Sequence, residues 1–321
     1  MKTTRRIVSL ISSATEILYL VGLGDQVVGV SHECDFPADV QTKPRLTRSL
    51  VEAAACSRDI DDQVRTLSSQ QSALYTVDAG QLAELAPDLI ITQSQCDVCA
   101  VRYEDVVSAV KNSPALKHTE VLALNPSHVT DVLRDIERIG AAADASDRAI
   151  QVVTELSARI SAVRAVTDAL PSEARPRVAC LEWIEPPMLA ANWMPEIIGW
   201  AGGNPGHTVS GAHSSYANWE DIVAFDPQVV VIMPCGFDLS RAIIESQVLP
   251  AIPGWSQLFA VKAGRVFAVD GNAYFNRSGP RLVDSLEILA HLLHPTKFAP
   301  GSPGTWCRLE TRDGALVEVT T

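Results

Sequence analysis

The sequence predicts an α/β fold in which two parallel-sheet lobes are bridged by one long rigid helix, with a ligand cleft between the lobes. Short β-branched runs alternate with amphipathic segments over residues 1–140, and the same alternation restarts over residues 171–294. Such alternation is typical of parallel sheets covered by helices. Between the two halves, residues 141–170 keep apolar residues at helical spacing and carry no strand signal. This segment therefore predicts a stiff helical connector.

The first half, residues 1–140, predicts a complete lobe with one insertion. Strands are expected at RRIVSLI, DQVVGVS, DLIIT and TEVLALN, and helices at TEILYLV, AGQLAEL and YEDVVSAVKNSP. Ser13 and Glu16 fit a capping box, with Ser13 at the N-cap of the first helix. Residues 45–76 are rich in Ser, Gln and Asp and are interpreted as an insertion.

The second half, residues 171–294, predicts a lobe of similar design. Strands are expected at PRVACLEW, DPQVVVIMP and GRVFAVDG, and helices at MPEIIGWAGG, WEDIVAF and SGPRLVDSLEILAHLLH. AELAPDLIIT and VAFDPQVVVIMP share one pattern, in which a helix is broken at proline and followed by a buried strand. The tail, residues 295–321, is punctuated by Pro and Gly and fits either an edge hairpin or a loosely held segment.

Composition and motifs exclude several classes of function. The net charge is −12 and no basic run exceeds two residues, which argues against nucleic-acid binding. Dinucleotide, P-loop, zinc-protease and nucleophile-elbow motifs are absent from the sequence, so we expect no enzyme. No stretch reaches about 18 clean apolar residues, so no membrane span is expected. The polar residues that break the N-terminal apolar run indicate mature structure, so we expect a cytoplasmic chain with free thiols. We also expect a monomer.

The loops after the predicted strands carry the candidate ligand-binding residues. In open parallel sheets ligands bind outside the carboxyl ends of the strands. Aromatic side chains there suit a large, flat, partly apolar ligand. The candidates at these loops and just beyond them are Cys34, Cys96, Cys99, Glu182, Trp183, Trp193, Cys235, Tyr274, Phe275, Arg277 and Arg281.

Cys96 and Cys99 form a C-x-x-C motif whose role the sequence leaves open. A redox role is disfavoured, because the surroundings are not a thioredoxin module and Asp97 opposes thiolate formation. One hypothesis is that thiols form part of a pocket wall. The alternative is a zinc or iron–sulfur site, since thiolates are preferred ligands of both. Its candidate ligands are Cys34, Cys96, Cys99, Cys235 and His32.

The order of segments over roughly residues 5–293 resembles the periplasmic binding proteins for vitamin B12, haem and iron-siderophores, and most of all the cobalamin-binding branch. The segments that carry the resemblance are RIVSLISSATEILYLVGLGDQVVGVSHECDFP, LAELAPDLIIT, WEDIVAFDPQVVVI and KAGRVFAVDGNAYFNRSGPRLVDSLEIL. The resemblance implies a non-enzymatic protein that holds a corrinoid or related metal chelate between its lobes. It places AYFNRSGPR at the cleft edge and makes periplasmic location the alternative to the cytoplasm.

The resemblance also implies a partner. Exported members of the family dock on an ABC permease through one surface glutamate on each lobe. Glu220 corresponds to the second-lobe glutamate, and Glu104 is the nearest candidate in the first lobe.

Overall fold

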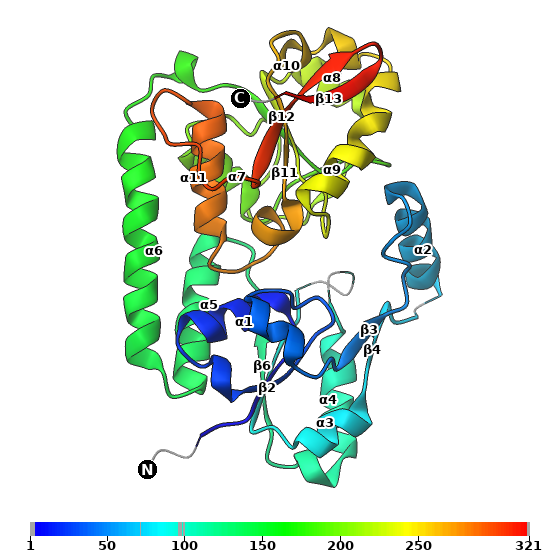
Figure 1. Cartoon of the computed structure of the whole chain (residues 1–321), viewed down its shortest axis with the longest axis vertical. Coiled ribbons are helices and arrows are strands. Elements are labelled where there is room, and N and C mark those ends of the chain that lie inside the picture. Colours follow the sequence, from blue (N-terminus) through cyan, green and yellow to red (C-terminus); the bar gives the residue numbers. More distant parts are fainter. Residues whose placement is uncertain (1–3, 71, 96–97, 99, 320–321) are drawn as a thin grey trace.

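The computed structural model describes residues 4–70, 72–95, 98 and 100–319. Two α/β lobes are stacked along the long axis of the molecule, and helix α6 (Ser146–Thr167) runs along one side from the first lobe to the second (Figure 1). The predicted fold class is confirmed. Cys96 and Cys99, with the motif that they form, lie outside the described residues.

The first lobe is built on a parallel sheet with the strand order β2-β1-β5-β6 among the described residues. Its strands are β1 (Ile7–Ser9), β2 (Val27–Val30), β5 (Leu89–Gln93) and β6 (Glu120–Leu124). Its helices are α1 (Ser12–Leu20), α3 (Ala79–Leu85), α4 (Tyr103–Asn112) and α5 (Val129–Ala142). All five residues of β5 are buried, so both faces of this strand are covered, which explains why its first three residues read as a continuous apolar run.

The second lobe has a mixed sheet with the order β13-β12-β11-β10-β7-β8-β9. Its strands are β7 (Val178–Trp183), β8 (Met188–Leu189), β9 (Ser215–Tyr216), β10 (Val229–Ile232), β11 (Val266–Val269), β12 (Trp306–Arg312) and β13 (Ala315–Val319). Its helices are α7 (Met194–Trp200), α8 (Trp219–Phe225), α9 (Leu239–Glu245), α10 (Phe259–Lys262) and α11 (Leu282–Leu293).

The sequence predicts a parallel sheet for the whole second lobe. In the structure, only the central strands β7, β10 and β11 are parallel. The flanking strands are antiparallel, because the tail returns as a β12–β13 hairpin on one edge and β8 and β9 pair on the other. Of the two alternatives for the tail, the edge hairpin is therefore the one that forms. Short 3₁₀ and π-helical turns complete the described chain, among them η7 (Gly271–Phe275) beside the site.

The two lobes share the helix–proline–strand design that the sequence indicates. Helices α3 and α8 both end at a residue in the left-handed conformation, Ala86 with φ 39° and Asp226 with φ 45°. Proline follows in each case, and the chain then enters a buried central strand.

The predicted capping box at the first helix is wrong. Helix α1 begins at Ser12, and its N-cap residue Ile11 makes no side-chain cap. Ser13 and Glu16 are instead buried. Their side chains face the second lobe, where the Ser13 hydroxyl lies 3.4 Å from that of Ser278. An interaction between lobes has replaced a local cap.

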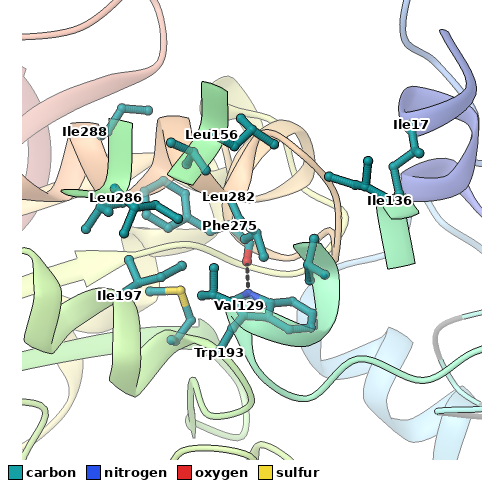
Figure 2. Close-up of a cluster of buried hydrophobic side chains, with 14 of the residues drawn as sticks. Ile17, Val129, Ile136, Leu156, Trp193, Ile197, Phe275, Leu282, Leu286 and Ile288 are labelled. Carbon is teal, nitrogen blue, oxygen red and sulfur yellow. Dashed lines mark hydrogen bonds between the residues drawn. The ribbon is translucent and has the colours of Figure 1, made fainter. Parts of the chain in front are cut away.

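One apolar core continues from the first lobe through α6 into the second lobe. It includes Ile17 and Ile136 from the first lobe, Leu156 from α6 and Leu286 from α11 (Figure 2). Arg159 of α6 adds an ion pair to Asp284 at 2.5 Å and one to Glu287 at 2.7 Å. Because close-packed interiors resist deformation, this side of the molecule holds the lobes in a fixed relation.

The region of the predicted insertion, residues 45–76, holds β3 (Thr47–Ser49) and α2 (Ser57–Ser69) and ends within β4 (Tyr75–Val77). Strands β3 and β4 pair with each other in a small separate sheet. Helix α2 extends beyond this pair toward α9 of the second lobe (Figure 1).

Candidate functional site

A cavity of about 540 Å³ lies between the lobes. This volume is within the range of about 300–1,000 Å³ that small-molecule sites usually have. Aromatic side chains from both lobes line it: Tyr75, Trp183, Trp193, Tyr216, Phe237 and Phe275. Amides of Gln93, Gln95, Asn192, Asn272 and Asn276 add polar groups. An apolar cavity with a few polar groups is the usual form of a site for a sizeable organic ligand.

The structure places six of the predicted ligand-binding residues in the cavity lining: Glu182, Trp183, Trp193, Cys235, Phe275 and Arg277. Three other candidates, Cys34, Tyr274 and Arg281, lie outside the described lining. Contact with a ligand stays a prediction for all of them.

Two tryptophans are fixed in place by hydrogen bonds from their indole nitrogens. Trp193 is buried and donates from Nε1 to the carbonyl oxygen of Phe275 at 2.9 Å (Figure 2). Trp183 donates from Nε1 to the carbonyl oxygen of Ser57 at 3.2 Å, and its ring lies 5.3 Å from that of Phe237. Both aromatic walls are therefore oriented by contacts between segments far apart in the sequence.

Arg277, from the second lobe, forms ion pairs with carboxylates of the first lobe. Its guanidinium is 7% exposed and contacts Glu16 at 3.1 Å and Asp35 at 2.5 Å. Burial by itself lowers the pKa of Arg277, but the hydrogen bonds and charges of Asp35 and Glu16 outweigh it, and the pKa is raised. Burial likewise acts to raise the pKa of Asp35, yet Arg277 holds that pKa below its ordinary value. Both partners are therefore ionised in the folded protein.

Arg281 strengthens the same junction. It donates to Glu16 at 2.9 and 2.6 Å, and its guanidinium lies 4.4 Å from the Phe36 ring and 5.4 Å from the Tyr274 ring. The segment AYFNRSGPR is thus a clamp between the lobes. Arg281 and Tyr274 support the edge of the cavity from outside its described lining.

The cysteines within the described part of the chain do not form a cluster of metal ligands. Cys34 is buried with its sulfur 3.1 Å from the Thr15 hydroxyl, and burial raises its pKa to about 11. Cys235 is exposed and lines the cavity. Among the described residues, no three His, Cys, Asp or Glu side chains are placed to hold a metal ion. A metal site would thus depend on Cys96 and Cys99, which lie outside the described residues, and a cysteine-lined cleft is not confirmed.

Both ring nitrogens of His32 contact polar side chains of its own lobe. Its Nδ1 lies 2.7 Å from the Thr47 hydroxyl, and its Nε2 lies 3.1 Å from a carboxylate oxygen of Glu33. The hydrogen bond from His32 lowers the pKa of Glu33, which does line the cavity. Glu33 therefore brings negative charge to the cavity.

Sequence reasoning missed the contribution of the insertion. Val51, Ala53, Ile60, Asp61 and Val64 all line the cavity. The available signal was the spacing of Ile60, Val64 and Leu67, an i, i+4, i+7 apolar stripe in an otherwise polar segment.

The fold and the cavity define a class of proteins that hold a ligand between two lobes joined by a helix. The chain belongs to the periplasmic binding protein family, whose model matches residues 7–273. Members of this family are substrate-binding proteins of ABC transporters and not enzymes, so this chain binds a small molecule for a permease partner.

Several named proteins are similar to this chain in sequence or in fold. An uncharacterised ABC transporter substrate-binding lipoprotein, YvrC of Bacillus subtilis, is 24% identical over 306 residues, which cover 92% of this chain and 82% of YvrC. The apo periplasmic haem-binding protein RhuT of Roseiflexus has a TM-score of 0.66 at 20% identity, covering 91% of this chain and 98% of RhuT. The periplasmic vitamin B12-binding protein BtuF of Vibrio cholerae has a TM-score of 0.65 at 19% identity, with the same coverage.

These findings do not support the expected cytoplasmic location. The family is periplasmic or extracellular, and YvrC is a lipoprotein. Within the described residues, no helix has the length and apolar character needed to cross a membrane.

Proposed function

We propose that this protein is the binding component of an ABC importer for a metal chelate of the corrinoid type. The observation that carries the proposal is the inter-lobe cavity, with Trp183, Trp193, Phe237 and Phe275 in its lining. Aromatic faces bury a flat macrocycle well, and the amides around them can bond its polar periphery. Vibrio BtuF and Roseiflexus RhuT, which bind B12 and haem by their names, share the fold.

The same proposal places the protein outside the cytoplasm and gives it a docking surface. Glu104 and Glu220 are both exposed and both lie in the first turn of a helix, α4 and α8 respectively. Each can meet a cationic side chain of a permease without first giving up a buried partner.

Titration of the purified protein with cyanocobalamin, followed by calorimetry and absorption, tests the ligand. We expect saturable binding of one molecule per chain. Trp183→Ala removes an aromatic wall, and we expect it to weaken binding about tenfold or more.

The matched control is Trp306→Ala. Trp306 is also partly buried and hydrogen-bonded, to the Pro300 carbonyl oxygen, but it lies in β12 and outside the described cavity lining. Equal loss of affinity in both variants, or binding of neither cyanocobalamin nor haem by the native chain, contradicts the proposal.

A further inference from the structure

Residues 50–70, which we name the strap, leave and re-enter the first lobe at a single narrow neck. Strand β3 precedes the strap and β4 follows it, and the two strands pair from Thr47 with Val77 to Ser49 with Tyr75. At the base of the strap, the Leu50 amide donates to the Leu74 carbonyl oxygen at 2.8 Å. Movement of the strap about this neck would leave the main sheet of the first lobe intact.

The strap has no apolar anchor in the body of the protein. None of the residues of α2, all of which the structure describes, belongs to the three buried cores. The buried side chains of α2 are Ser57 and Asp61, which are polar. Its apolar residues Ile60 and Val64 face the cavity instead. Apolar burial therefore does not hold α2 in place until a ligand fills the cavity.

Polar contacts hold the strap against the second lobe. Glu245 accepts from the Ser57 amide at 3.0 Å, which caps the start of α2, and the Ser57 carbonyl oxygen accepts from Trp183 Nε1 at 3.2 Å. Arg58 pairs with Glu185 at 2.5 Å, and the Tyr216 hydroxyl donates to Asp61 at 2.5 Å. The Arg241 guanidinium donates to the carbonyl oxygens of Ala53 and Ala55. Arg58 is mostly exposed, so its ion pair with Glu185 contributes little net free energy. The other contacts are hydrogen bonds that are replaced by bonds to water when the strap opens, so each has a small net contribution.

We propose that the strap is a releasable wall of the binding site, which detaches from the second lobe to admit the ligand and closes over it afterwards. The ligand class rests on the proposed function above, but the opening of the strap does not. On the opposite side of the cavity the lobes are fixed by the continuous core through α6. Access is therefore gained by moving the strap, and the lobes keep their relation.

Ligand binding and strap closure are coupled through the inner face of α2. When the strap is closed, Ile60, Asp61 and Val64 contribute to the cavity wall. A ligand that contacts them binds the closed form more tightly than the open form and shifts the population toward closure. When the contacts of Arg58 and Glu245 are removed, the open form should gain population and the bound ligand should escape faster.

Hydrogen exchange on the ligand-free protein tests the opening directly. We expect the amides of α2 to exchange at least tenfold faster than those of α6, and faster still in the double variant Arg58→Ala/Glu245→Ala. Neither residue lines the described cavity. Arg65→Ala is the matched control, because Arg58 and Arg65 are on the same helix with 66% of each side chain exposed, yet Arg65 pairs with Asp61 of its own helix. Exchange in α2 as slow as in α6, in native and double-variant chains alike, overturns the proposal.

Release of cyanocobalamin, chased with excess competitor, tests the coupling. We expect the double variant to release it about five- to tenfold faster than the native chain, and Arg65→Ala to match the native chain. Unchanged release in the double variant overturns the coupling. If cyanocobalamin fails to bind at all, the proposed ligand is wrong, while exchange in the ligand-free protein still decides whether the strap opens.

Discussion

At the scale of single residues, the ligand preference of the site depends on which of its charged groups already bond to other protein groups. Both described arginines of the cavity lining, Arg241 and Arg277, bond to protein oxygens. Carboxylates of Glu33, Asp61 and Glu182 also line the cavity. Such a lining favours a neutral or cationic ligand with hydrogen-bond donors and disfavours one that carries carboxylates.

Replacing Asp61 with Asn tests this charge preference. Haem carries two propionates and cyanocobalamin carries amides, so we expect the variant to improve haem affinity relative to cyanocobalamin about tenfold. Parallel titrations with both ligands measure the ratio. Asp59→Asn, an exposed change on the same helix, is expected to leave the ratio as it is. A ratio unmoved by Asp61→Asn would show that this carboxylate does not act on the ligand.

The Asp35–Arg277 pair predicts a pH dependence of stability. The pKa of Asp35 is lowered in the folded protein, so the unfolded chain binds its proton more readily. The pair thus stabilises the fold above the unfolded pKa of about 3.9 and loses this contribution as the pH falls below it. Thermal unfolding between pH 3 and 6 should show Asp35→Asn less stable at pH 6, with the difference from the native chain shrinking toward pH 3. A constant difference would contradict the assignment.

At the scale of elements, the sequence predicted most of the helices and central strands because their apolar spacing is local information. What it missed depends on partners far along the chain. Ser13 and Glu16 carry a local capping signal, yet they bond to Ser278, Arg277 and Arg281 more than 260 residues away. The strap was predicted only as an insertion. Its contacts with the second lobe are polar, and such contacts leave no periodic pattern in the sequence from which the partner residues could be identified.

The α5–α6 corner offers a test of element packing. A Cβ added at Gly140 would lie 2.4 Å from the Cβ of Ala149, so the two helices can approach only because Gly140 has no side chain. We expect Gly140→Ala to lower the free energy of unfolding by about 2 kcal/mol, through overpacking. Denaturant titration measures it. At Gly199 in α7 an added Cβ meets nothing within 4 Å, so Gly199→Ala should be neutral or slightly stabilising.

At the scale of the whole molecule, the two-lobed fold could be predicted from the alternation of elements and the unbroken helical spacing between the halves. The candidate site could be predicted only in part, since strand-end loops located Trp183, Trp193 and Phe275 but not the residues that the strap supplies. The cysteines show what the sequence pattern does not predict. Cys34 and Cys235 both follow strands, yet Cys34 is buried and Cys235 is exposed. Position along a strand does not tell which way a side chain points.

Native mass spectrometry with an equimolar mixture of cyanocobalamin and haem identifies the bound ligand and its stoichiometry in one spectrum. We expect a single adduct, one cyanocobalamin per chain, that diminishes in Trp183→Ala and persists in Trp306→Ala. A chain that carries neither chelate, or one whose bound mass is instead a zinc ion or iron–sulfur cluster lost with Cys96→Ser and Cys99→Ser, would contradict it.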